Sequence, residues 1–395
     1  MTTIVTPAQS ILGAPRFKAL PPLALYVHVP WCLRKCPYCD FNSHELRGEL
    51  PHDAYLAALV ADLEQSLPLV WGRPVYSIFI GGGTPSLLPP ETVDALLAAV
   101  RARVPLIVDA EITLEANPGT FERARFEGFR AAGVNRLSIG VQSFDPRHLA
   151  ALGRVHDDDQ ARRAIECAQA VFENFNIDLM YGLPGQTLPE ARADIAEALH
   201  YAPPHLSVYH LTLEPNTYFH RYPPVLPDDD ATAEMQDSIE TMLAARGYGH
   251  YETSAFAQPG RTCRHNLNYW TFGDYLGIGA GAHSKLSLPG KVVRHMRYRQ
   301  PREYQERAGA GDAVQETREV TRSELGFEFM MNALRLTEGV PVSLFEERTG
   351  RPLTDIAREL DEAERRGLLA RDHLKLAPTA LGRRFLNDLL QIFLP

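Results

Sequence analysis

Between residues 23 and 246 the sequence alternates six short apolar runs with six longer segments of helical periodicity. A series of strands that are each followed by a helix predicts parallel strands joined by right-handed crossovers. The runs are apolar along their length, which is typical of parallel strands buried on both faces. The six units fall short of the eight that close a complete barrel. We therefore predict an α/β fold built on an open, partial (β/α)6 barrel of the TIM type.

The predicted strands are Leu23–Val29, Val75–Ile80, Glu111–Ala116, Arg136–Val141, Phe175–Tyr181 and Leu206–Leu213. The predicted helices are Asp53–Leu67, Glu91–Arg101, Phe121–Ala131, Asp157–Val171, Pro189–Leu199 and Asp230–Arg246. We divide the chain into an N-terminal extension at 1–22, the barrel at 23–246, and two further segments at 247–319 and 320–395. Residues 247–319 are rich in glycine, aromatic residues and histidine, and they show no clear alternation of strands and helices.

The last segment, residues 320–395, predicts a helical, winged-helix-like domain. Its predicted helices are Thr321–Leu334, Pro341–Thr349, Leu353–Arg366 and Thr379–Ile392, with an apolar hairpin at Leu368–Leu376. Winged helices often bind DNA, but this segment carries 11 Lys and Arg residues against 12 Asp and Glu residues. Without a basic face, DNA binding is excluded. We expect a lid or a surface on which a partner docks.

Three of the five cysteines, Cys32, Cys36 and Cys39, lie within eight residues directly after the first predicted strand. An odd number of clustered cysteines is a poor disulfide framework. Thiolates gathered on one loop favour a soft metal centre, such as zinc, copper or an iron–sulfur cluster. Zinc sites and ordinary iron–sulfur clusters use four protein ligands, and no fourth cysteine lies near. Three thiolates would leave one iron of a [4Fe–4S] cluster open to a small molecule, while a zinc knuckle or redox-sensing thiols are the alternatives.

Polar and glycine residues follow the predicted strands at the ends where barrel enzymes place their chemistry. The segments at these ends are Gly81–Pro85, Glu115–Gly119, Gly140–Ser143 and Asp178–Gly185. The glycine run permits close backbone approach to a ligand. Glu115 and Asp178 are placed to accept hydrogen bonds from ribose hydroxyls or an ammonium group, or else to lie on a solvated loop or cap a helix. Arg154 is a candidate partner for a carboxylate or part of a surface ion pair.

Composition limits the functional classes. A net charge of −9 argues against binding to the phosphate backbone of nucleic acids. No apolar run approaches the roughly 20 residues of a membrane span, and the N-terminus lacks a secretory signal pattern. Few cysteines, mostly clustered, fit a reducing compartment. We expect a cytoplasmic protein that neither binds nucleic acid nor spans a membrane.

The cysteine spacing, with Tyr38 just before the last cysteine, resembles the radical S-adenosylmethionine (SAM) superfamily. That resemblance implies a [4Fe–4S] cluster on Cys32, Cys36 and Cys39 whose open iron binds SAM. The segments Tyr26–Cys32, Gly81–Pro85, Glu115–Pro118, Gly140–Ser143 and Asp178–Thr187 narrow the resemblance to the HemN/HemW branch. By analogy with that branch, the SAM cavity is lined by Tyr26, Tyr38, Gly82, Gly83, Thr84, Glu115, Gln142, Arg154, Asp178 and Thr212.

Two features favour the HemW side of this branch, which contains heme chaperones. HemN-type oxidases have a further cysteine where this chain has Phe41. The run His265-Asn-Leu-Asn-Tyr-Trp270 resembles the HNxxYW signature of HemW. Histidine is a common axial ligand of heme iron, and flat aromatic side chains suit a porphyrin. The resemblance implies His265 as the heme ligand and His283 as a neighbour of porphyrin or SAM, while Cys263 stays open and Cys167 fits a buried core position.

Two functions follow from the resemblance. The first is a heme chaperone that carries a SAM-binding [4Fe–4S] cluster and delivers heme to acceptor apoproteins, with a small electron donor as a further partner. The second is an enzyme, a radical SAM coproporphyrinogen III oxidase that decarboxylates its substrate to protoporphyrinogen IX. Fold alone does not separate them. Phe41 and His265 favour the chaperone.

Overall fold

The computed structural model describes residues 14–120 and 123–395. Residues 1–13 of the predicted N-terminal extension, and Phe121 at the start of the predicted third helix, lie outside this part of the chain. Within the described ranges, none of the helices combines the length and apolar character needed to cross a membrane.

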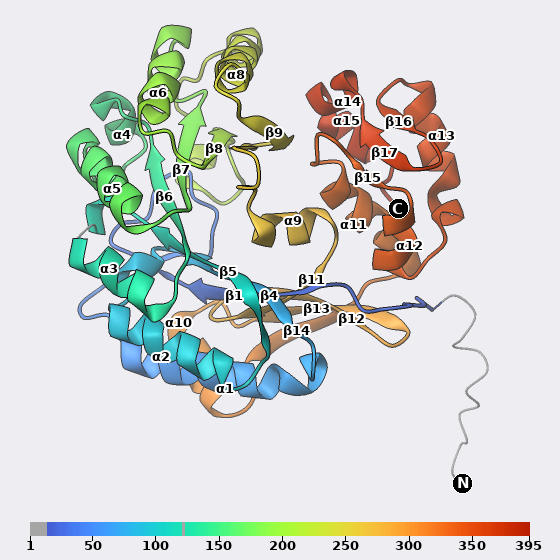
Figure 1. Ribbon diagram of the computed structural model, residues 1–395, viewed down its shortest axis with the longest axis horizontal. Coiled ribbons are helices and arrows are strands. Elements are labelled where there is room, and N and C mark those ends of the chain that lie inside the picture. Colours follow the sequence, from blue (N-terminus) through green and yellow to red (C-terminus); the bar gives the residue numbers. More distant parts are fainter. Residues whose placement is uncertain (1–13, 121–122) are drawn as a thin grey trace.

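The six predicted strands form a parallel, open barrel (Figure 1). In spatial order they are β1 (Leu23–Val29), β4 (Val75–Gly82), β5 (Leu106–Ala116), β6 (Arg136–Gln142), β7 (Phe175–Tyr181) and β8 (His205–His210). The order runs from β1 to β8 and then onward to other strands, so the barrel does not close on itself. The predicted partial (β/α)6 barrel is confirmed: β1 and β7 match the prediction, and the other four strands differ from it by one to five residues at one or both ends.

Helices cover the outside of this barrel. They are α1 (His52–Val70), α2 (Pro90–Arg101), α3 (Arg123–Ala132), α4 (Pro146–Ala151), α5 (Asp158–Val171), α6 (Leu188–His200) and α8 (Asp229–Ala244), whereas the short α7 (Tyr218–Arg221) lies against the cysteine loop, where the backbone N–H of Phe219 donates to Pro37. Capping boxes fix where two of them begin. Asp157 and Gln160 start α5, and Thr187 and Glu190 start α6. Each box satisfies backbone N–H groups that a helix leaves without partners at its first turn.

The inner face of the barrel is polar, and our expectation of strands apolar on both faces was wrong. On β6, Arg136, Ser138 and Gln142 line an internal cavity, whereas Leu137 and Ile139 belong to the apolar core beneath the helices. Side chains alternate between the faces of a strand, so the polar residues of β6 share one face. The core therefore lies between sheet and helices, and the interior is left for ligands.

Residues 247–319 add strands that the sequence pattern did not reveal. These are β9 (Gly249–Glu252), β10 (Ala255–Ala257), β11 (Asp274–Ile278), β12 (His283–Leu288), β13 (Lys291–Arg297) and β14 (Val314–Glu319), with helices α9 (Arg264–Trp270) and α10 (Pro301–Gly309). They extend the barrel at both edges into a sheet of 12 strands. Buried Asp274 secures this extension, because its carboxylate accepts hydrogen bonds from Lys285 and Arg73.

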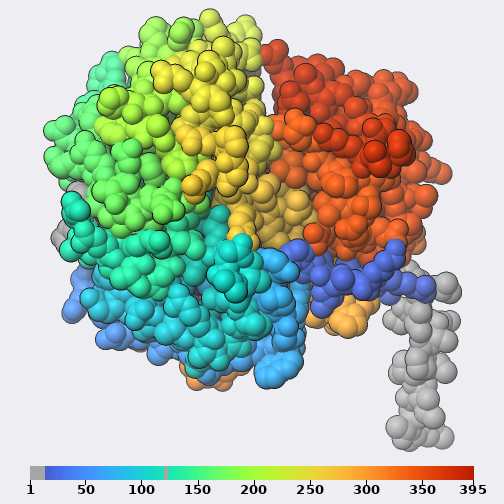
Figure 2. All heavy atoms as spheres, viewed as in Figure 1, coloured from blue at the N-terminus to red at the C-terminus, as the bar shows by residue number. Residues whose placement is uncertain are grey.

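The C-terminal segment forms helices and a small sheet, as predicted. Its elements are α11 (Arg322–Ala333), β15 (Val340–Pro341), α12 (Ser343–Thr349), η3 (Leu353–Ile356), α13 (Ala357–Arg365), β16 (Leu369–Arg371), β17 (Lys375–Pro378), α14 (Ala380–Arg384) and α15 (Leu386–Gln391). The predicted last helix is divided in two at Phe385. In Figure 2 the early residues run along the foot of this domain, where the backbone N–H of Arg16 donates to Gly350.

Candidate functional site

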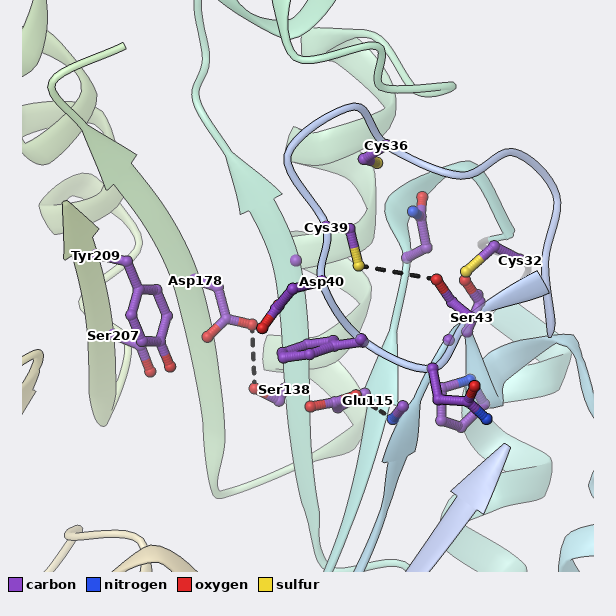
Figure 3. Close-up of a pocket in the computed structure, with 18 of the residues that line it drawn as sticks. Cys32, Cys36, Cys39, Asp40, Ser43, Glu115, Ser138, Asp178, Ser207 and Tyr209 are labelled. Atoms are coloured by element: carbon purple, nitrogen blue, oxygen red, sulfur yellow. Dashed lines mark hydrogen bonds between the residues drawn. The ribbon is translucent and has the colours of Figure 1, made fainter. Parts of the chain in front are cut away.

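One cavity of about 1060 Å³ opens inside the barrel. Its volume lies at the upper end of the roughly 300–1,000 Å³ of pockets that enclose small molecules. The structure brings every predicted site residue to its wall: Tyr26, Cys32, Cys36, Tyr38, Cys39, Gly82, Gly83, Thr84, Glu115, Gln142, Arg154, Asp178, Thr212, His265 and His283. Figure 3 shows the cysteine loop on one side of this space and the side chains of Asp178, Ser207 and Tyr209 on the other.

The cysteine loop is held at its base by short strands and by Asn42. β2 (Trp31–Cys32) pairs with β3 (His44–Glu45), which closes the loop. The Asn42 amide donates to the backbone carbonyls of Ala280 and Arg299. The backbone carbonyl of Asn42 lies 2.9 Å from Nε2 of His28. The loop that carries the cysteines therefore has a fixed position relative to β1 and β11.

His28 links the loop to the cavity wall as a neutral ring. Burial lowers the pKa of His28 to about 4, so the ring is uncharged at neutral pH. Because the Asn42 carbonyl can only accept, Nε2 carries the proton. Nδ1 then accepts from the hydroxyl of Tyr26 at 3.0 Å. Tyr26 is thus oriented within the cavity by the same residue that anchors the loop.

The three cysteines are free thiols that share the cavity without converging on a single point. Cysteines bound to one tetrahedral zinc ion lie within about 4.6 Å of each other, twice the metal–sulfur distance. Among the described residues, only Asp145, His148 and Glu190 have ligand atoms that all lie within 4.8 Å. The wider spread of Cys32, Cys36 and Cys39 suits a cluster of several irons better than one zinc ion.

The surroundings of the cysteines are polar and include a cation. Burial raises the pKa of Cys32 and of Cys39, so these thiols stay protonated until a metal displaces the proton. Nη1 of Arg154 donates to Sγ of Cys36 at 3.6 Å. Its Nη2 donates to the Gly140 carbonyl at 2.7 Å. Arg154 therefore joins the cysteine loop to β6, and the surface ion-pair alternative does not apply.

The glycine run at the end of β4 is required by contacts within the protein. Gly82 has φ +113°, and a Cβ there would lie 2.5 Å from Cε1 of His28. A Cβ on Gly83 would lie 2.5 Å from the Trp31 carbonyl oxygen. The sequence predicts that glycine is needed here to leave room for a ligand. In the structure, a side chain at these positions would first collide with the His28 ring and with Trp31 of β2, which leads into the cysteine loop.

Glu115 and Asp178 are buried carboxylates on the cavity wall. Burial, with Asp178 near, raises the pKa of Glu115 to about 8. Asp178 accepts hydrogen bonds from Ser138 at 3.2 Å and from Asn176 at 2.7 Å, and burial raises its pKa as well. Neither caps a helix in this structure. Two carboxyl groups with unfilled acceptor positions facing a cavity can bind hydroxyl or ammonium groups.

Gln142 marks a strained point at the end of β6. Its φ is +73°, and the pairing of β6 with β7 shifts register between Gly140 and Gln142. A left-handed conformation in a residue other than glycine costs about 1–3 kcal/mol and is found at functional sites. The bulge turns the Gln142 side chain into the cavity.

The predicted heme ligand, His265, lies on α9 at the cavity wall and is 1% exposed. Its Nδ1 lies 2.9 Å from Oγ of Ser77, and its Nε2 lies 3.0 Å from the hydroxyl of Tyr269. Burial and the charge of Arg136 lower the pKa of His265 to about 3. The ring is therefore neutral, and both nitrogens already have partners.

The remaining candidates occupy different surroundings. Cys263 is fully buried and donates to Glu111 at 3.5 Å, and burial raises the pKa of Cys263 to about 12. Cys263 is also absent from the residues that line the cavity. His283 is exposed at the cavity rim. Cys167 belongs to the apolar core of α5, as predicted.

Sequence reasoning missed several residues that line the cavity. They are Arg136, Ser138, Asn176, Ser207 and Tyr209. The available signal was the alternation of polar and apolar residues along β6, β7 and β8. Those strands had been interpreted as uniformly apolar, so their polar face was overlooked.

Comparison with known proteins identifies the family. A model described as the Radical SAM superfamily matches residues 26–199, and one described as the HemN C-terminal domain matches residues 320–385. The heme chaperone HemW of Escherichia coli (strain K12) is 50% identical over 379 residues, which cover 95% of this chain and 99% of that protein. This chain belongs to the HemW family. The heme chaperone HemW of Haemophilus influenzae is 44% identical over 95% of this chain and 98% of its own.

Solved structures agree with this assignment. Coproporphyrinogen III oxidase (HemN) from Escherichia coli, a radical SAM enzyme, superposes with a TM-score of 0.80 at 25% identity. The match covers 98% of this chain and 92% of that one. The radical SAM fold and the resemblance to the HemN/HemW branch are thus confirmed for a HemW family member.

Proposed function

We propose that this chain is a heme chaperone that binds heme in the barrel cavity and delivers it to acceptor apoproteins. The observation that carries the proposal is the placement of His265 on the wall of the cavity that the cysteine loop enters. Relatives named heme chaperone HemW, similar over nearly their full length, support the same function. The described cysteines are all free thiols, which fits a cytoplasmic location.

The cysteine loop and the adjacent strand ends hold a [4Fe–4S] cluster and SAM in this proposal. Cys32, Cys36 and Cys39 bind the cluster, whose open iron can chelate the amino and carboxylate groups of SAM. Arg154 balances the charge of the thiolates, since its guanidinium contacts Cys36. Glu115 and Asp178 accept hydrogen bonds from the hydroxyl or ammonium groups of SAM. Tyr26, Tyr38, Gly82, Gly83, Thr84, Gln142, Thr212 and His283 complete the wall around it.

His265 is suited to a heme iron by its protonation state and by its neighbours. A neutral imidazole is the form that binds metals. Ser77 accepts or donates at Nδ1, and such a bond to the second nitrogen typically orients a metal-binding histidine. Nε2 becomes available when the Tyr269 hydroxyl turns away. One axial histidine holds heme in a defined orientation and still permits its release.

Phe41 distinguishes this function from coproporphyrinogen III oxidation. The side chain is 58% exposed and lines the cavity mouth. A phenyl group there offers apolar surface to a porphyrin but cannot bind metal as a cysteine would. The likeness to HemN keeps the oxidase as the second candidate.

Heme titration and a decarboxylation assay on the same preparation test the proposal. Anaerobically reconstituted protein should bind heme with a Soret band typical of histidine ligation. It should not convert coproporphyrinogen III when supplied with SAM and dithionite. Steady decarboxylation by the wild type would establish the oxidase instead, and absence of heme binding would overturn the chaperone.

A further inference from the structure

Arg136 is a buried cation on the floor of the cavity whose donors are not used by the protein. The residue is 2% exposed and is the first residue of β6. Its Nε is buried without a hydrogen-bond partner. Within residues 14–120 and 123–395, the Arg136 guanidinium donates no hydrogen bond to another side chain or to the backbone. A buried charge in this condition is costly unless an anion pairs with it.

Two carboxyl groups, those of Glu111 and Asp178, interact electrostatically with Arg136, and Glu111 is already engaged by the start of α9. One carboxylate oxygen accepts from Sγ of Cys263 at 3.5 Å and from the backbone N–H of His265 at 3.0 Å. The other accepts from the backbone N–H of Arg264 at 3.1 Å. Glu111 therefore balances charge near Arg136 through space and leaves the guanidinium donors free. A guanidinium presents its N–H groups as a planar fork that matches a carboxylate.

The depth of Arg136 separates it from the expected position of SAM. On β5 and β6, Thr113 pairs with Arg136 and Glu115 pairs with Ser138. Arg136 thus lies two residues, about 6.6 Å along the strand, below the layer that contains Glu115. The carboxylate of SAM belongs at the cysteine loop, on the opposite side of that layer. The guanidinium on the floor is therefore open to a carboxylate other than that of SAM.

His265 and Arg136 face the same part of the cavity. Both line it, and the charge of Arg136 contributes to the low pKa of His265. Heme carries propionate side chains at its edge, several ångströms from its iron. We infer that Arg136 is the binding site for a propionate carboxylate of heme when His265 ligates the iron. This inference rests on the proposed function and adds the group that would orient the porphyrin.

Heme and its dimethyl ester, in which the carboxylates are neutral, provide the test. The full-length protein is titrated with each compound, and binding is followed by Soret absorbance. A charge-assisted hydrogen bond contributes enough for the wild type to prefer heme over the ester by roughly tenfold or more. Arg136→Gln should bind both compounds with the same, weaker affinity. Arg136→Lys should retain part of the preference, because lysine keeps the charge but lacks the fork.

Arg335→Gln is the matched control. Arg335 also lines the cavity, but its guanidinium donates to Glu252 and stacks 4.3 Å from the ring centre of Trp270. This variant should keep the preference for heme. SAM affinity should be unchanged in Arg136→Gln, since the SAM site lies in a different layer.

The outcomes separate this inference from the proposed function. Equal affinity of the wild type for heme and for the ester overturns the role of Arg136 and leaves the chaperone intact, even where Arg136→Gln fails to fold. A preference that persists in Arg136→Gln and is lost in Arg335→Gln also overturns it. Failure of the wild type to bind either compound overturns both.

Discussion

The backbone N–H of Gly82 donates a hydrogen bond to the carboxyl group of Glu115 at 3.0 Å. This contact joins the glycine run at the end of β4 to the buried carboxyl on β5. A Cβ on the neighbouring Gly81 would lie 3.0 Å from the same carboxyl oxygen. The glycine run and the Glu115 carboxyl group therefore pack directly against each other, so a change in one should disturb the other.

Glu115→Gln should change how stability depends on pH. The pKa of Glu115 is about 8 in the folded protein and near 4.3 in an unfolded chain. Between these values the folded state binds the extra proton, so its stability falls as pH rises. Between pH 5 and 9 the wild type should lose on the order of 3 kcal/mol relative to Glu115→Gln. Thermal unfolding of both proteins, without cluster or SAM, measures the difference.

Glu190→Gln is the control for that experiment. Hydrogen bonds from Thr187 and Arg147 lower the pKa of Glu190 to about 2. Its contribution to stability is lost only as pH falls below about 4.3, so this variant should parallel the wild type between pH 5 and 9. If the stability of Glu115→Gln also changes with pH in parallel with that of the wild type, the Glu115 carboxyl is ionised at neutral pH.

Gly82→Ala should destabilise the protein and weaken SAM binding. The new Cβ would meet the ring of His28, and φ of +113° is unfavourable for alanine. The cost should be about 1–3 kcal/mol, and movement of His28 would disturb Tyr26 at the same time. Gly247→Ala serves as control, because φ there is +80° but no atom lies within 4 Å of the added Cβ. Unfolding measurements and calorimetry with SAM on the reconstituted protein give both readouts, and unchanged SAM affinity would place its site elsewhere.

Cys36→Ala should abolish cluster binding. In the proposed site three thiolates hold the cluster, and no other cysteine lines the cavity among the described residues. Reconstituted wild type should contain about four irons per chain, and the variant almost none. Cys167→Ala, which removes a thiol from the core of α5, should retain the iron. Stoichiometric zinc in place of iron would favour the structural zinc alternative.

The strongest sequence patterns predicted the barrel. Weaker patterns did not reveal the short strands that extend it, for a physical reason. Long alternation of apolar strands and amphipathic helices fixed β1 and β7 to the residue. Strands β9 and β10 escaped notice because they are four and three residues long. Such strands are stabilised by the sheet edges they join rather than by their own pattern.

Site residues that belong to a sequence motif were predicted, whereas residues that only the fold brings into the cavity were not. The cysteine spacing and the glycine run placed their residues in the cavity directly. Arg136 shares the polar face of β6 with Ser138, and this alternation was overlooked because β6 was interpreted as apolar along its length. The hydrogen bond between His265 and Ser77 joins residues 188 positions apart, and no local pattern contains that information.

Tyr269→Phe should strengthen heme binding if iron replaces the tyrosine hydroxyl at Nε2 of His265. In the present structure the two atoms lie 3.0 Å apart, so heme must displace this hydrogen bond. A net hydrogen bond contributes about 0.5–1.5 kcal/mol, and its removal should tighten binding by roughly two- to tenfold. The Soret band should keep its histidine character, whereas His265→Ala should weaken binding or change the spectrum with the cluster intact.

Tyr275→Phe is the matched control for this prediction. Its ring packs edge-on against Tyr269 with centres 4.6 Å apart, and it lines the same cavity. Its hydroxyl accepts from Arg294 at 2.6 Å and has no contact with His265, so heme affinity should not change. Weaker binding by Tyr269→Phe would mean that the hydroxyl contacts heme directly. If His265→Ala gives the same heme spectrum as the wild type, His265 is not the axial ligand. His283, the exposed histidine at the cavity rim, would then be the candidate.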